Sequence, residues 1–205
     1  FWDSDAEIKH YPAREYLYRV ITNERRFPLW TEKVLFGHAL YSDLENAYLN
    51  PVNVLSIVLA GPVISYKIIH FLSIIVGSLA LFRLLSKKGL GPVSYTGAIL
   101  VYFYSFFHLN HLIHFNLIPI SMIFPLNILL ADLFIETLKK KYLYLQALVL
   151  GYGLLWGHPQ TSILVFLGIS IYVLIVGSQI RSRTKIVYLL SVLVFSFAVI
   201  PYFNS

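Results

Sequence analysis

From Val52 to the end of the sequence, long apolar runs are separated only by short polar turns, and this pattern limits the fold more than any other feature. A membrane-spanning helix needs about 20 mainly apolar residues, with a range of roughly 17–25. The fourth run is the shortest, and we expect it to form a helical hairpin with the fifth. The runs lie near 65–86, 91–108, 117–137, 142–157, 161–178 and 185–202. The sequence therefore predicts an all-α, polytopic transmembrane helix bundle of about six spans.

The composition agrees with a protein that lies in lipid. Hydrophobic residues make up 58% of the chain and charged residues only 13%, whereas soluble domains carry about 25% charged residues. The net charge of +6 comes from short basic clusters between apolar runs, which argues against nucleic acid as a partner and for the lipid bilayer. The chain has no cysteine, so disulfides and Cys-ligated metals are excluded.

The basic residues alternate between successive turns of the apolar region. The turns around 108–116 and 157–161 contain no Lys or Arg. The positive-inside rule places the basic turns in the cytoplasm and the others outside, which predicts a multi-pass protein of the plasma membrane. The three basic clusters are Arg83, Lys87 and Lys88; Lys139, Lys140 and Lys141; and Arg181, Arg183 and Lys185.

The chain divides into residues 1–51, which are polar, and residues 52–205, which form the predicted transmembrane domain. The first part has eight acidic and six basic residues, and the alternation of the turns places it outside the cytoplasm. After Pro12, Leu17 and Val20 recur at helical spacing, which predicts a short amphipathic helix along the membrane surface. The next apolar stretch, 52–60, is too short to span and stops at Gly61-Pro62, so an interfacial or re-entrant helix is expected.

The sequence begins at Phe1 and its only methionine is Met122, so we expect it to be a fragment, open at both ends. No phosphate-binding Gly-rich loop, His-Glu-x-x-His or Gly-x-Ser-x-Gly motif occurs. These absences argue against an ATPase, a zinc protease and a serine hydrolase.

Polar side chains gather in the segments that this topology places outside. An extended chain would point Asp3, Asp5 and Glu7 to one side, where they could act as catalytic acids or bases or hold a divalent cation. Ordinary solvated surface charge is the alternative for these three residues. His158, in a polar turn, is more typical of a helix cap than of a ligand. The other polar candidates in or near these segments are Lys9, His10, Arg14, Asp43, Glu45, Lys67, His108, His111, His114 and Gln160.

Asp132 and Glu136 lie near the inner end of the third run, one helical turn apart. An acid within a span is a functional candidate by default. Because Lys139–Lys141 follow closely, interfacial ion pairs such as Glu136 with Lys140 are the favoured interpretation.

Several short motifs together resemble the YfhO-like family of bacterial membrane proteins, and they follow the family's order along nearly the whole chain. One departure is Glu45, where a glutamine or a similar residue is expected. The motifs are Asp5–Pro12, Phe27–Trp30, Phe36–His38, Asp43–Asn53, His111 with Pro119 and Asp132, and Gly157–Gln160.

The resemblance implies a GT-C-type glycosyltransferase, which moves a sugar from a polyprenyl-phosphate donor to an extracytoplasmic glycan, lipid or protein acceptor. On this interpretation Asp5 is the catalytic base, Asp3 or Glu7 supports it, and Asp3 and Asp5 would hold any divalent cation. The predicted substrate-binding residues are Lys9, Arg14, Asp43, Glu45, Lys67, His111, His158 and Gln160.

Two non-enzymatic interpretations remain beside the glycosyltransferase. A transporter or flippase of lipid-linked glycans would normally place charged residues near the middle of the membrane. The apolar runs here are almost free of charge at their centres, and the polar residues lie at the rims, which favours surface chemistry. A structural scaffold subunit would need none of the acids in the outer segments.

Overall fold

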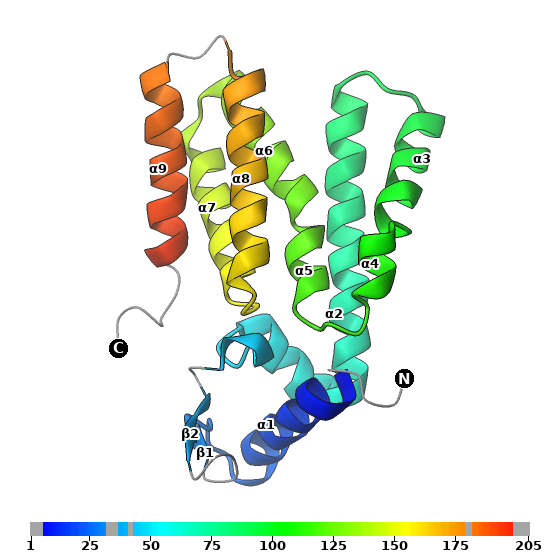
Figure 1. Cartoon of the computed structure of the whole chain (residues 1–205), viewed down its shortest axis with the longest axis vertical. Helices are drawn as coiled ribbons and strands as arrows, with labels where there is room; N and C mark the ends of the chain where they lie inside the picture. The colour runs from blue at the N-terminus through cyan, green and yellow to red at the C-terminus, as the bar shows by residue number, and fades with distance from the viewer. Residues whose placement is uncertain (1–5, 32–36, 41–42, 179–181, 199–205) are drawn as a thin grey trace.

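The computed structural model describes residues 6–31, 37–40, 43–178 and 182–198, and most of them are helical. A bundle of helices stands on a smaller N-terminal unit, which contains α1 and a two-stranded antiparallel sheet (Figure 1). The sheet pairs β1 (Trp30–Thr31) with β2 (His38–Ala39), with Trp30 opposite Ala39. The all-α prediction is confirmed, because the sheet has only two residues in each strand.

The predicted helix after Pro12 is present. A short π-helix, η1 (Ala6–His10), leads into α1 (Tyr11–Asn23), and Pro12 lies in the first turn, where its missing N–H costs nothing. Leu17 and Val20, which the helical spacing placed on the apolar face, are buried. Leu17 packs with three apolar residues of the following segments in a small core of its own: Leu40, Tyr48 and Ile57.

The long helix α2 (Pro51–Lys87) starts in the N-terminal unit and then runs the length of the bundle (Figure 1). Asn50 caps it by accepting hydrogen bonds from the backbone N–H groups of Val52 and Asn53, at 3.0 and 3.1 Å. The predicted break is present, because Gly61 has φ 74° and ψ 169°, outside the helical region, and Pro62 follows. Residues 52–60 are therefore the first arm of a bent helix and not a separate one.

Arg14 of α1 ties the two arms of α2 together. Its guanidinium donates to Asn53 Oδ1 on the first arm at 2.6 Å, and to Ser65 Oγ on the second arm at 2.5 Å. Its Nε also donates to the carbonyl oxygen of Pro62 at 3.1 Å, and the guanidinium lies 4.4 Å from the centre of the Phe115 ring. Arg14 is only 2% exposed, so this link lies inside the protein.

The remaining helices alternate in direction through the bundle (Figure 1). α5 and α6 form one continuous apolar segment, Leu117–Thr137. The helices are α3 (Pro92–Phe103), α4 (Phe106–Asn110), α5 (Leu117–Met122), α6 (Phe124–Thr137), α7 (Lys140–Leu154), α8 (Pro159–Val176) and α9 (Ser182–Ala198). A 3-10 helix, η3 (Leu44–Asn46), precedes α2.

Within the described residues, three helices are long and apolar enough to cross a membrane: Pro51–Lys87, Leu117–Thr137 and Pro159–Val176. The other three predicted spans do not form such helices there. The run at 91–108 is divided after α3, because Ser105 starts a new helix by accepting a hydrogen bond from the backbone N–H of His108. α7 has 15 residues, and the described apolar part of α9 is Thr184–Val194.

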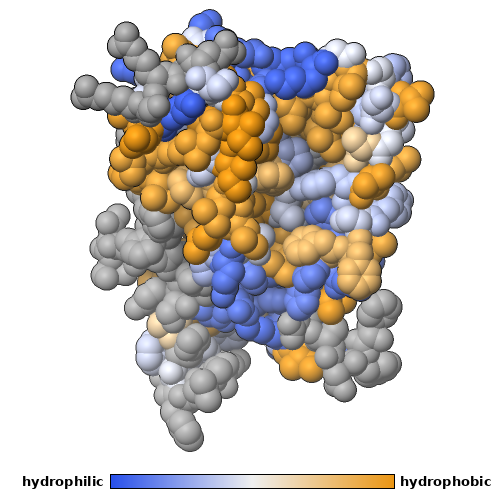
Figure 2. All heavy atoms as spheres, turned by 45° about the horizontal axis from the view of Figure 1, so that its top comes forward, coloured by the Kyte–Doolittle hydropathy of each residue, from blue (hydrophilic) through white to orange (hydrophobic). Residues whose placement is uncertain are grey.

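The two ends of the bundle differ in charge. The α2–α3 and α6–α7 links, the end of α8 and the start of α9 lie at one end, and the α4–α5 and α7–α8 links lie at the other, next to the N-terminal unit (Figure 1). Two described basic clusters, Arg83 to Lys88 and Lys139 to Lys141, therefore share one end, which we call the basic end. Figure 2 shows a broad hydrophobic surface between more hydrophilic regions, as a protein embedded in lipid requires.

At the basic end, Asp132 of α6 is 1% exposed and accepts three hydrogen bonds. Lys87 of α2 and Lys88, the residue that follows this helix, donate to it at 2.5 and 2.7 Å, and the hydroxyl of Tyr172 of α8 donates at 2.6 Å. Glu136 pairs with Lys87 at 2.6 Å. The predicted pairing of these acids with Lys139–Lys141 is wrong, because Leu138 has a left-handed conformation (φ 52°) that ends α6 before the lysines.

Candidate functional site

A group of ionisable and amide side chains gathers at the end of the bundle opposite the basic end. Its members come from η1, η3, the α4–α5 link and the start of α8, which lie close together where the N-terminal unit meets the bundle (Figure 1). We call this group the polar cluster. It consists of Lys9, His10, Asp43, Glu45, Asn46, His111, His114 and His158.

Glu45 is the carboxylate at the centre of the polar cluster. It forms an ion pair with Lys9, which lies 36 residues earlier in the sequence, and both side chains are about half exposed. The hydrogen bond from Lys9 lowers the pKa of Glu45, burial opposes this change, and the positive charges of Lys9, His10 and His158 lower the pKa further. Glu45 is therefore ionised at neutral pH and can accept hydrogen bonds from a bound molecule.

His10 is joined to Asp43 through Asn46. The Asn46 amide donates to Asp43 Oδ2 at 2.6 Å, and its oxygen Oδ1 lies 3.0 Å from His10 Nδ1. Because an amide oxygen only accepts, His10 Nδ1 carries the proton, and in the neutral ring the lone pair is on Nε2. His10 is 2% exposed, and its ring packs 5.9 Å from that of Phe115, so its orientation is fixed.

His158 begins α8. Its Nδ1 accepts a hydrogen bond from the backbone N–H of Thr161 at 3.4 Å and lies 2.8 Å from the hydroxyl oxygen of the same residue. Burial lowers the pKa of His158, the negative charge of Glu45 opposes this change, and His114 and His111 lower the pKa further. The neutral ring is thus the form that caps the helix, as the turn interpretation of this residue predicted.

Acidification should remove this cap. The folded pKa of His158 lies below its unfolded value, so the cap is intact above the ordinary histidine pKa of about 6.5 and is lost as the pH falls below it. We expect a loss of about 1 kcal/mol of stability, typical of one N-cap. Thermal unfolding between about pH 5 and pH 8 would be compared for the wild type and His158→Asn, because asparagine caps helices without titrating. An equal pH dependence in both proteins would show that other histidines are responsible.

His111 and His114 border the polar cluster on the α4–α5 link. The Nδ1 of His111 lies 2.7 Å from the carbonyl oxygen of Phe107, and its ring stacks on the Phe107 ring at 4.4 Å. The His111 and His114 ring centres are 5.3 Å apart. Both rings lie close enough to His158 to lower its pKa.

The structure does not bring all predicted site residues together. Lys9, Asp43, Glu45, His111 and His158 belong to the polar cluster. Glu7, Lys67 and Gln160 are exposed, and Arg14 is buried with its donors on protein acceptors, so their predicted roles toward substrate stay predictions. Asp3 and Asp5 lie outside the described residues.

The predicted substrate-binding residues did not include His10, Asn46 and His114. His10 and His114 were polar candidates of the outer segments, but their types and spacing did not assign them a role. Asn46 gives no sequence signal, because its role depends on contacts with Asp43 three residues earlier and with His10 in a separate segment.

The described residues contain no group of three or more His, Asp or Glu side chains that could hold a metal ion. The predicted divalent cation would be held by Asp3 and Asp5, which this finding does not cover, so that site stays a prediction. Comparisons with protein-family models, with curated proteins and with solved structures found no match to this chain.

Proposed function

We propose that this chain is the catalytic part of a multi-pass membrane glycosyltransferase of the GT-C type. It transfers a sugar from a polyprenyl-phosphate donor to an acceptor outside the cytoplasm. The observation that carries the proposal is the polar cluster, where an ionised carboxylate, several imidazoles and an ammonium group meet at one end of an apolar bundle. The substrate class, a polyprenyl-phosphate sugar, is proposed from the resemblance of the sequence motifs to YfhO-like proteins.

The distribution of charge between the two ends supports the proposed orientation. Arg83, Lys87, Lys88 and Lys139–Lys141 share the basic end, which the positive-inside rule assigns to the cytoplasm. The polar cluster lies at the opposite end and therefore outside. A lipid-linked sugar in the outer half of the membrane would present its phosphate at the depth where the apolar helices meet the N-terminal unit.

The reaction needs one base and one place for negative charge. The acceptor hydroxyl oxygen attacks C1 of the sugar, and its proton passes to a carboxylate, for which Asp5 is the predicted residue. The bond between C1 and the phosphate oxygen breaks, and its electron pair remains on the lipid phosphate. Lys9 lies in the polar cluster four residues after Asp5, and its ammonium group can stabilise the developing charge.

Glu45 and His158 are proposed to bind the sugar or the acceptor. Ionised Glu45 would accept hydrogen bonds from sugar hydroxyls, as carboxylates do in binding sites. Neutral His158 keeps its Nδ1 on the helix backbone and presents Nε2–H as a donor. Asp3 or Glu7 supports the charge of Asp5.

The experiment is a transfer assay on membranes that contain the complete protein, with a labelled polyprenyl-phosphate sugar. We expect Asp5→Asn to lower transfer about 10²–10⁴-fold, the usual contribution of a general base. The conservative control is Glu24→Gln, because Glu24 forms an exposed pair with Arg26 on the surface of the N-terminal unit. That variant should retain full activity at equal expression.

Three results would count against the proposal. Equal transfer by the wild type and Asp5→Asn would remove Asp5 from the mechanism. Full activity of Glu45→Gln would remove the polar cluster from substrate binding. Absence of transfer by the wild type would contradict the enzyme assignment for that donor and favour a transporter of lipid-linked glycans.

A further inference from the structure

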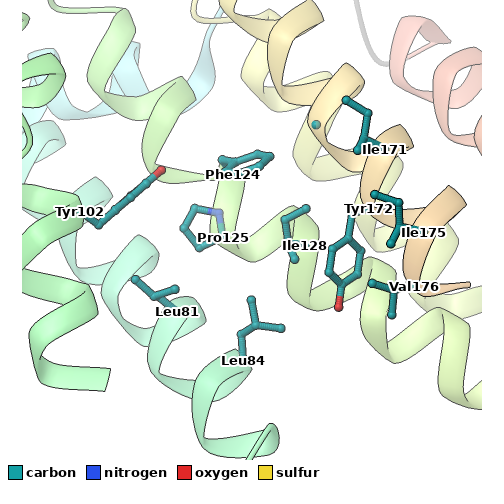
Figure 3. Close-up of a pocket in the computed structure, with 11 residues that line it drawn as sticks. Leu81, Leu84, Tyr102, Phe124, Pro125, Ile128, Ile171, Tyr172, Ile175 and Val176 are labelled. Carbon is teal, nitrogen blue, oxygen red and sulfur yellow. The ribbon is translucent and has the colours of Figure 1, made fainter. Parts of the chain in front are cut away.

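A groove of about 460 Å³ lies in the half of the bundle that is nearer the basic end. Leu81 and Leu84 of α2, residues of α6 and residues of α8 form its walls, and Figure 3 shows their side chains turned toward the common space. Ile171 and Ile175 are 58% and 69% exposed, so the groove is open along α8. Its volume lies within the roughly 300–1,000 Å³ of small-molecule sites.

The walls of the groove are almost entirely apolar, but one end is polar. Tyr172 turns its hydroxyl toward the end where Leu84 and Val176 lie (Figure 3). This hydroxyl donates to Asp132 Oδ1 at 2.6 Å, and Lys88 Nζ donates to the same oxygen at 2.7 Å. The Lys88 ammonium therefore lies beside the polar end of the groove, and its side chain is 44% exposed.

The basic end of the bundle, toward which this end of the groove lies, carries an excess of positive charge. After residue 51 the whole sequence contains only two acids, Asp132 and Glu136, and both already pair with lysines of α2. The described cations at the basic end of the bundle outnumber them. These cations are Arg83, Lys87, Lys88, Lys139, Lys140, Lys141 and Lys185. An anionic group is therefore the complementary partner for the polar end of the groove.

We propose that the groove binds one anionic phospholipid, with an acyl chain along the apolar walls and the phosphate at Lys88. An ammonium group beside an apolar slot matches both halves of such a lipid, and basic pockets between helices on the cytoplasmic side are typical headgroup sites. The proposal rests on the embedding of the chain in a membrane and not on transfer activity. Because the groove and the polar cluster belong to opposite ends, this lipid is distinct from the proposed donor.

The experiment uses the whole chain, reconstituted in vesicles with equal amounts of phosphatidylglycerol and phosphatidylcholine. The protein is extracted and stripped of lipid stepwise, and the lipids that remain bound are identified by native mass spectrometry. We expect phosphatidylglycerol to be the last lipid retained by the wild type. Lys88→Gln should lower the retention of phosphatidylglycerol relative to phosphatidylcholine about fivefold, the effect of one basic residue near a lipid phosphate.

Two further variants separate the groove from general surface charge. Lys140→Gln removes the same charge at the same end but outside the groove, and it should leave the lipid ratio unchanged. Ile175→Trp fills the groove at an exposed position and should lower the retention of phosphatidylglycerol without changing the charge. Lys88→Gln is expected to fold, because Asp132 keeps its bonds to Lys87 and Tyr172.

Three outcomes would overturn the proposal. Equal effects of Lys88→Gln and Lys140→Gln would show a diffuse attraction to the basic surface. Equal retention of both lipids by the wild type would show that charge does not select the occupant. A second copy of the chain or no lipid at all in the stripped wild type would give the groove to a different partner or to none.

Discussion

Replacement of Arg14 by methionine should lower the free energy of unfolding by about 2–4 kcal/mol. The substitution removes three hydrogen bonds from a charged donor, each worth roughly 1.5–3 kcal/mol, and leaves the oxygens of Asn53, Pro62 and Ser65 without that donor. Part of this loss is offset, because the buried cation no longer has to be removed from water. Burial already lowers the pKa of Arg14 to about 10, against the opposing effect of Tyr66, which indicates the size of that cost.

Arg14→Lys provides the decisive comparison. Lysine keeps the charge but lacks the planar fork that reaches both arms of α2, so we expect it to destabilise at least as much as methionine. Arg19→Met is the matched control on the same helix, because Arg19 is exposed and pairs only with Glu15 one turn away. Thermal unfolding in mild detergent measures all three variants. If Arg14→Lys left the stability unchanged, the planar guanidinium would not be what holds the two arms of α2.

Replacement of Asp132 by asparagine should cost about 3–5 kcal/mol, the usual effect of breaking a buried ion pair. The carboxylate accepts from Lys87, Lys88 and Tyr172, and therefore joins α6 to α2 and α8. An amide carries no charge, and its NH₂ group would face an ammonium group. Lys87, whose side chain is 25% exposed, would keep only Glu136 as its acidic partner.

Glu136→Gln is the control for this prediction. Glu136 also pairs with Lys87, but its side chain is 48% exposed, and exposed pairs contribute about 0–1 kcal/mol. Unfolding in detergent should therefore separate the two variants by at least 2 kcal/mol. If both variants lost the same stability, the burial of Asp132 would not be the cause.

Local signals in the sequence predicted the bend of α2 and the position of α1. Gly61 adopts a positive φ that other residues rarely adopt, and Pro62 lacks an N–H. The Gly-Pro dipeptide therefore predicts a break in the helix. Pro12 and the spacing of Leu17 and Val20 likewise specify a helix with one apolar face. These features depend on neighbours within a few residues, which explains why they could be predicted.

Features that depend on distant residues could not be predicted in this way. Glu136 and Lys140 are four residues apart, but the left-handed Leu138 separates them into different helices. The true partner of Glu136, Lys87, comes from another helix. Serine is a common N-cap, so Ser105 was a local signal for the start of α4. It was not used, because the run at 91–108 was assigned as one helix from its hydropathy.

The candidate site also has features that the sequence predicted and features that it did not. Alternating turn charge placed Glu45 and His158 at one end of the bundle, and the effect of each side chain on the pKa of the other shows that they lie near each other. The pairing of Lys9 with Glu45 joins η1 to η3 across 36 residues, so it depends on tertiary packing and not on a local pattern. Residue types and sidedness were therefore predictable, whereas the partner of each group was not.

The tie between Arg14 and α2 sets an order of events during synthesis. Asn53 and Ser65 follow Arg14 by 39 and 51 residues, so Arg14 is synthesised before either acceptor exists. Until then the cation is better hydrated in water than in an apolar interior. The N-terminal unit therefore acquires its final position only after both arms of α2 have been made, and the contacts of Arg14 with both arms require the bend at Gly61.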